Sequence, residues 1–110
     1  MSKRAGVAEE LFWDCAAQLF ANPDLRESTM FGFRCIRLRN QFVAMPALDR
    51  LWVKLPAERV NQLIDSGVGE ECAPNGRRFR EWVKVVEANE SLWLGLLQES
   101  MEFVSALRMK

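Results

Sequence analysis

No histidine occurs among the 110 residues of the chain. Mechanisms that pair a serine or cysteine nucleophile with a histidine base are therefore excluded. A structural zinc ion usually takes four cysteine or histidine ligands in close pairs, whereas Cys15, Cys35 and Cys72 lie far apart in the sequence. We therefore predict no metal site and no cofactor. We expect reduced, buried thiols, as in cytosolic proteins.

Phosphate-binding loops and membrane segments are also missing. Gly67-Val68-Gly69 lacks the lysine and the serine or threonine that complete such a loop, and a helix cap explains these glycines more simply. No apolar run approaches the roughly 20 residues that cross a bilayer. The first residues contain no apolar signal segment, and Glu9 and Glu10 follow early. We expect a cytoplasmic protein without membrane contact.

The residues that are present make up an ordinary globular composition, with 49% hydrophobic and 27% charged residues. The 15 basic and 15 acidic residues cancel, so the chain as a whole has no long-range attraction to nucleic acid or to anionic membranes. A chain of this length can bury one core without disulfides or metals. We predict a single domain over residues 1–110.

Apolar residues at helical spacing predict three helices, over residues 7–21, from Pro56 to Gly67 and from Asn89 onward. Proline suits the first turn of a helix, glycine its left-handed C-terminal cap and asparagine its N-cap. The last helix carries a broad apolar band, which indicates a principal core element.

Aromatic and branched residues predict strands over residues 29–38, 41–47, 51–55 and 79–86. The apolar alternation of the first strand changes phase between Cys35 and Ile36, which indicates a bulge or a strand covered on both faces. Tight turns at Arg39-Asn40 and Asp49-Arg50 make the first three strands antiparallel. Helices on one face of such a sheet give a two-layer α+β domain.

One face of the predicted sheet combines tryptophan with basic residues. Leu51 and Val53 should face one way along their strand, and Phe79, Val83 and Val85 one way along theirs, so the residues between them point to the opposite face. The candidate binding residues on that face are Trp52, Lys54, Arg80, Trp82 and Lys84. Additional positive charge comes from Arg34, Arg37 and Arg39.

Tryptophan beside a cation can stack on a base or hold an anionic ligand. An alternative stays open, in which both tryptophans pack against a helix or a partner and the basic side chains cover them.

Several segments resemble the TfoX N-terminal domain family of small bacterial α+β proteins and its YjbR-like relatives. The segments are Met30-Phe31-Gly32, Phe42-Val43-Ala44-Met45, Arg50-Leu51-Trp52-Val53-Lys54-Leu55, Leu55-Pro56-Ala57-Glu58-Arg59-Val60, Pro74-Asn75-Gly76-Arg77 and Arg80-Glu81-Trp82-Val83. The resemblance covers residues 7–104 and implies the order αβββαββα, with Met30-Phe31-Gly32 opening the first strand. It implies no catalytic residues. Named members regulate competence genes and carry a second, C-terminal domain, so the resemblance implies at most an accessory regulatory role here.

Three functions compete at this stage. The first is a non-enzymatic binding module for a protein partner or a small ligand, acting as an accessory regulator. The second is single-stranded nucleic-acid binding through the basic-aromatic face, which would depend on salt. The third is a small enzyme or small-molecule binder that uses Cys35 or Cys72, and it requires a thiol of lowered pKa. A homodimer, formed through an edge strand or the last helix, is compatible with each.

Overall fold

The structure is a computed structural model and describes residues 3–30, 32–73 and 76–108. Within these ranges three helices and six strands occur, and every strand pair is antiparallel. Across the sheet the strands lie in the order β1-β2-β3-β4-β6-β5. Along the chain the elements are α1 (Lys3–Leu19), β1 (Leu25–Met30), β2 (Phe33–Leu38), β3 (Gln41–Ala47), β4 (Arg50–Lys54), α2 (Ala57–Asp65), β5 (Gly69–Glu71), β6 (Trp82–Val85) and α3 (Glu90–Arg108).

This architecture confirms the predicted α+β class but adds one strand to the predicted order. The segment expected to form one strand over residues 29–38 contributes to two, β1 and β2, which pair from Leu25 opposite Leu38 to Met30 opposite Phe33. Most of β1 is charged or polar, so no apolar alternation marks it in the sequence. Met30 therefore ends a strand instead of opening one, and Gly32 lies in the turn with a φ of +82°. Phe31 lies outside the described residues.

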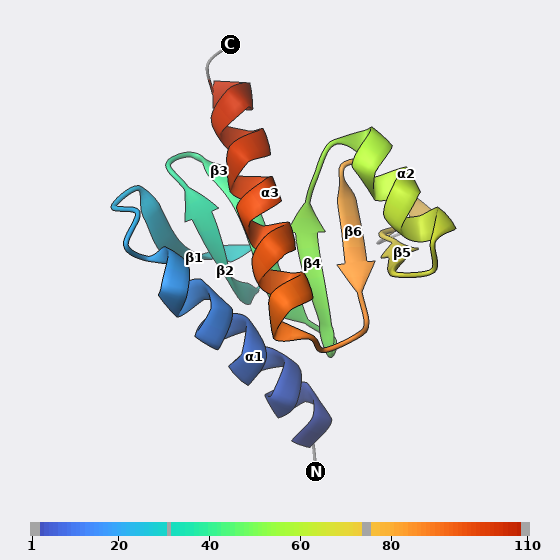
Figure 1. The fold of residues 1–110 in the computed structure, drawn as a ribbon, viewed down its shortest axis with the longest axis horizontal. Coiled ribbons are helices and arrows are strands. Elements are labelled where there is room, and N and C mark those ends of the chain that lie inside the picture. Colours follow the sequence, from blue (N-terminus) through green and yellow to red (C-terminus); the bar gives the residue numbers. More distant parts are fainter. Residues whose placement is uncertain (1–2, 31, 74–75, 109–110) are drawn as a thin grey trace.

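All three helices lie in front of the same face of the sheet in Figure 1. Helices α1 and α3 pack against β3 and β4, and α2 packs against β5 and β6. The main core fills the space between the two layers, and Leu51, Val53, Val83 and Val85 contribute to it from the strands. Strand alternation predicted this direction for all four residues. None of the described helices is both long and apolar enough to cross a membrane.

The predicted helix boundaries hold where a capping residue marks them. Pro56 directly precedes α2, and Gly67 follows it with a φ of +85°. The side-chain oxygen of Asn89 accepts a hydrogen bond of 2.9 Å from the Leu92 N–H, which caps α3. The first helix ends at Leu19, two residues before its predicted end.

The two predicted hairpin turns are present, with changes in detail. In the first, Arg39 and not Asn40 has a positive φ, of 58°. In the second, Leu48 and Asp49 have φ values of 54° and 63°, so the turn lies one residue earlier than predicted and Arg50 begins β4. Two successive positive φ values give a turn whose twist matches that of paired strands.

A bulge in β3 decides which side chains share a face. Ile36 pairs with Ala44 whereas Arg37 pairs with Phe42, so Val43 is an additional residue on β3. Cys35 is buried in a cluster apart from the main core that contains Ile36. The second explanation of the phase change is therefore confirmed, because β2 is covered on both faces. The bulge places its additional residue on β3 and leaves the pairing of β2 with β1 unbroken, so it does not explain the phase change.

The bulge is tied to α3 by a buried hydroxyl group. Ser100 is fully buried and donates a hydrogen bond of 3.1 Å to the carbonyl oxygen of Val43. Replacing Ser100 with alanine removes a donor from this buried acceptor, and we expect a loss of about 1 kcal/mol in the free energy of unfolding. Urea denaturation would measure it. The exposed Ser105→Ala control should change stability by roughly 0.5 kcal/mol or less, and equal stability of the two variants would contradict this role.

Candidate functional site

A second apolar cluster lies on the face of the sheet opposite the three described helices, which we call the helix-free face. Cys35, Met45 and Ala47 are buried there, and partly buried hydrophobic residues pack against them: Met30, Phe42 and Trp52. The bulge brings Phe42 into this cluster, because the additional residue at Val43 shifts the alternation of β3. The helix-free face thus has an apolar centre.

A hollow of about 430 Å³ opens on this face. Its lining residues come from β1, the β2–β3 turn, β3, β4, β6 and the loop before β6. Aromatic and methionine side chains dominate its lining, and among the described residues Lys54 is its one charged member. The lining residues are Thr29, Met30, Asn40, Gln41, Phe42, Met45, Trp52, Lys54, Phe79 and Trp82.

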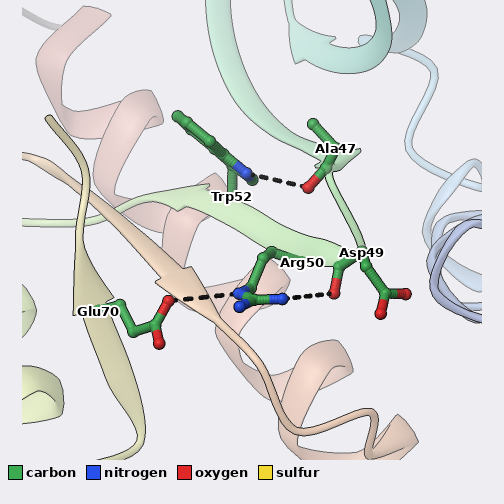
Figure 2. Close-up of polar contacts among 5 residues, drawn as sticks. All are labelled: Ala47, Asp49, Arg50, Trp52 and Glu70. Atoms are coloured by element: carbon green, nitrogen blue, oxygen red, sulfur yellow. Dashed lines mark hydrogen bonds and ion pairs between the residues drawn. The ribbon is translucent and has the colours of Figure 1, made fainter. Parts of the chain in front are cut away.

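The position of Trp52 at the edge of the hollow is fixed by the β3–β4 hairpin. Its indole N–H donates a hydrogen bond of 3.1 Å to the carbonyl oxygen of Ala47, which Figure 2 shows. Its cross-strand partner is Met45, a buried member of the second cluster. An indole held in this way loses little conformational entropy when a ligand packs on its ring.

Beside Trp52, an ion pair joins the strands β4 and β5. Arg50 lies 3.2 Å from Glu70 and also donates to the carbonyl oxygen of Asp49 (Figure 2). The charges of Arg50 and Glu70 thus compensate each other close to Trp52. The lysines of this face have no such carboxylate partner within the described residues.

Two tryptophans and two lysines alternate across β4 and β6. Trp52 lies opposite Lys84, and Lys54 lies opposite Trp82. The Lys84 ammonium nitrogen is 5.6 Å from the centre of the Trp52 ring, within reach of a cation–π interaction. Each indole therefore has a lysine as its direct cross-strand neighbour, an arrangement that can hold a ring and an attached charge together.

The structure brings together four of the five candidate residues. Trp52, Lys54 and Trp82 line the hollow, and Lys84 lies next to it over Trp52. Arg80 is exposed but does not line the hollow, because β6 begins only at Trp82 and strand alternation does not extend back to residue 80.

The three additional arginines, which were expected near the candidate residues, lie in different parts of the fold. Arg34 lies over the ring of Trp13 in α1 and pairs with Glu27, so it is on the helix side of the sheet. Arg37 lies 5.6 Å from the centre of the Phe42 ring, at the rim of the hollow. Arg39 pairs with Asp24. Only Arg37 thus adds charge close to the hollow.

Two aromatic residues of the hollow were not predicted to face it. Phe79 was placed on the same side as Val83, but it lies in a loop and lines the hollow with Trp82. Phe42 has the wrong parity relative to Met45 until the bulge between them is taken into account. No feature of the sequence predicts the bulge in β3.

The three cysteines are free and buried, as predicted. Burial raises the pKa of Cys72 from its usual value of 9.0 to about 12 and that of Cys15 to about 11, and it raises the pKa of Cys35 as well. A thiol that keeps its proton at neutral pH is a poor nucleophile. These shifts argue against the cysteine-based function.

We expect all three thiols to react slowly with Ellman's reagent at pH 8, and rapidly after unfolding in urea. The reason is that burial limits access of the reagent to the sulfur atoms, and the raised pKa values keep the thiols protonated. Glutathione under the same conditions gives the rate of an exposed thiol. Rapid, stoichiometric labelling of one thiol in the folded protein would return the cysteine hypothesis to consideration.

Comparison with known proteins adds no relative. No family model matches the chain, no curated protein matches it, and no solved structure matches its fold.

Proposed function

We propose that the chain is a non-enzymatic binding module that uses the helix-free face of its sheet to hold an apolar, preferably aromatic, group. The observation that carries the proposal is the hollow of about 430 Å³, which lies within the size range of small-ligand pockets. Its lining combines aromatic and methionine side chains with a few polar groups. Such a composition is typical of ligand sites.

The burial pattern supports binding at this face over a purely structural role. The main core lies on the other side of the sheet and contains the large side chains that stabilise the fold. Trp52 and Trp82 are only partly buried, so both retain ring surface that a ligand can cover. Covering such surface is favourable by about 25 cal/mol per Å².

The resemblance to the TfoX N-terminal domain family adds the proposal of an accessory regulatory role. In this proposal the hollow binds a ligand or a partner side chain, and this binding regulates another cellular component. This role rests on the quoted segments and on no further match, and it requires the binding activity proposed above.

The test is a titration of the ¹⁵N-labelled protein with 2-naphthamide, a neutral aromatic probe, followed through the four indole N–H signals. We expect the signals of Trp52 and Trp82 to shift, because both residues line the hollow. The signal of Trp93 should stay in place, because this residue is fully buried on the helix side. About −0.3 kcal/mol per heavy atom gives a Kd on the order of 1 mM.

The double variant Trp52→Ala, Trp82→Ala lacks both reporting indoles, so its binding is followed through the backbone amide signals of Phe42 and Met45, which also line the hollow. These signals should shift in the unmodified protein and stay in place in the variant, which should remain folded because neither tryptophan belongs to the main core. Assignment of the signals comes from single Trp→Phe variants. Shifts confined to Trp13, or no shift at several millimolar probe, would overturn the proposal.

A further inference from the structure

From the charges around the hollow we infer that its occupant is a small aromatic anion, such as an aryl carboxylate. The inference rests on the proposed function, because it names the class of ligand for the same site. It begins with the lining itself. Lys54 is the one charged residue among the described lining residues, and no carboxylate is among them. A negative charge in the hollow would therefore meet a cation and no competing anion among these residues.

The strand register places ring and charge receptors side by side. Lys54 lies directly opposite Trp82, and Lys84 directly opposite Trp52. Directly opposed residues in an antiparallel pair have Cβ atoms about 4.5–5.5 Å apart. A ring stacked on either indole can thus direct its charge toward the lysine of the neighbouring strand.

The other charged residues near the hollow do not cancel its preference for an anionic ligand. Glu70 lies opposite Lys84 on β5, but it forms an ion pair with Arg50. Arg37 lies over the Phe42 ring at the rim and adds a further positive charge. Lys54, Lys84 and Arg37 thus place three positive charges in or next to the hollow, although the whole chain carries no net charge.

The size of the hollow and the charges around it favour a free small molecule over a nucleic-acid strand. Its aromatic walls reach from Phe42 to Phe79, and its volume of about 430 Å³ accommodates one compact ligand. A strand needs a basic groove that continues along its backbone. Arg39 in the β2–β3 turn and Arg50 on β4 are instead engaged in ion pairs with Asp24 and Glu70.

The test compares 2-naphthoate with 2-naphthamide, which have the same ring and nearly the same shape but differ in charge. In 20 mM salt we expect naphthoate to bind about fivefold more tightly, as the shift of the Trp52 and Trp82 indole signals measures. In 500 mM salt the ratio should fall toward one, because salt screens a partly exposed charge. The ratio of the two affinities removes effects common to both probes.

Variants locate the source of the preference. Lys54→Gln should abolish the preference for naphthoate, measured as the ratio of the two affinities within this variant. Arg78→Gln, which removes an exposed cation that does not line the hollow, should retain the full preference. A preference that survives Lys54→Gln would overturn the role of this lysine.

The other outcomes separate this inference from the proposed function. If naphthamide shifts both indole signals and naphthoate binds no more tightly, the binding module stands and the anionic ligand is refuted. If neither probe shifts them, both fail. If a single-stranded tetranucleotide displaces naphthoate and binds far more tightly at low salt, the occupant is a nucleic-acid strand and the small-molecule inference is overturned.

Discussion

Replacing Trp93 with alanine is expected to lower the free energy of unfolding by about 3–5 kcal/mol, the range for truncating a fully buried tryptophan. Trp93 is 0% exposed and belongs to the main core. Its indole N–H also donates a hydrogen bond of 2.7 Å to the carbonyl oxygen of Glu87, which fixes the start of α3 against the segment after β6. The alanine variant therefore leaves both a cavity and an unpaired acceptor.

The matched control is the same substitution on the other face. Trp82 is only partly buried and lies outside the main core, so Trp82→Ala should cost roughly 1.5 kcal/mol or less. Urea denaturation of both variants gives the comparison. If Trp93→Ala does not fold, Trp93→Phe keeps most of the ring and should cost about 1–2 kcal/mol through the lost hydrogen bond. Equal costs for the two alanine variants would contradict the assignment of the core to the helix side.

Two glycine-to-alanine substitutions are expected to change stability in opposite directions. A Cβ atom on Gly69 would lie 2.4 Å from Cγ2 of Val83 and 3.2 Å from Cβ of Leu63, so α2 and β6 would have to separate. We expect Gly69→Ala to destabilise the fold by about 1–3 kcal/mol, as overpacking does. A Cβ atom on Gly95 meets no atom within 4 Å, and glycine within a helix is unfavourable. Gly95→Ala should therefore stabilise by about 0.5–1 kcal/mol.

Thermal and urea unfolding of the two variants would measure both effects in parallel. The opposite signs matter, because a general effect of reduced chain flexibility would stabilise both variants. Stabilisation by Gly69→Ala would show that α2 does not pack closely on the sheet at this position.

The sequence predicts the fold well where apolar periodicity or a capping residue is present. Helix α3 begins after Asn89 as predicted, because an N-cap precedes its long apolar pattern. Strand β3 has the predicted bounds, because tight turns precede and follow its mostly apolar residues. Strand β1 was not predicted as a separate strand, because its residues are mostly polar and pairing with β2 stabilises it. Pairing between distant residues leaves no local signal.

The candidate site is predicted only in part for a related reason. Trp52, Lys54, Trp82 and Lys84 follow from simple alternation along two strands, and the register of β4 with β6 confirms that they share a face. Whether that face was open or covered could not follow from the sequence, because it depends on where the helices pack.

The measurement that tests the account most directly uses protein labelled with 5-fluorotryptophan, which gives one ¹⁹F signal for each of its four tryptophans. A soluble gadolinium chelate should broaden the signals of Trp52 and Trp82, which are partly exposed, and leave that of Trp93 sharp. Saturating 2-naphthoate should then protect Trp52 and Trp82 from broadening without affecting Trp13. If Trp52 and Trp82 are insensitive to the chelate from the start, or if the probe protects neither, the helix-free face is not an open binding surface.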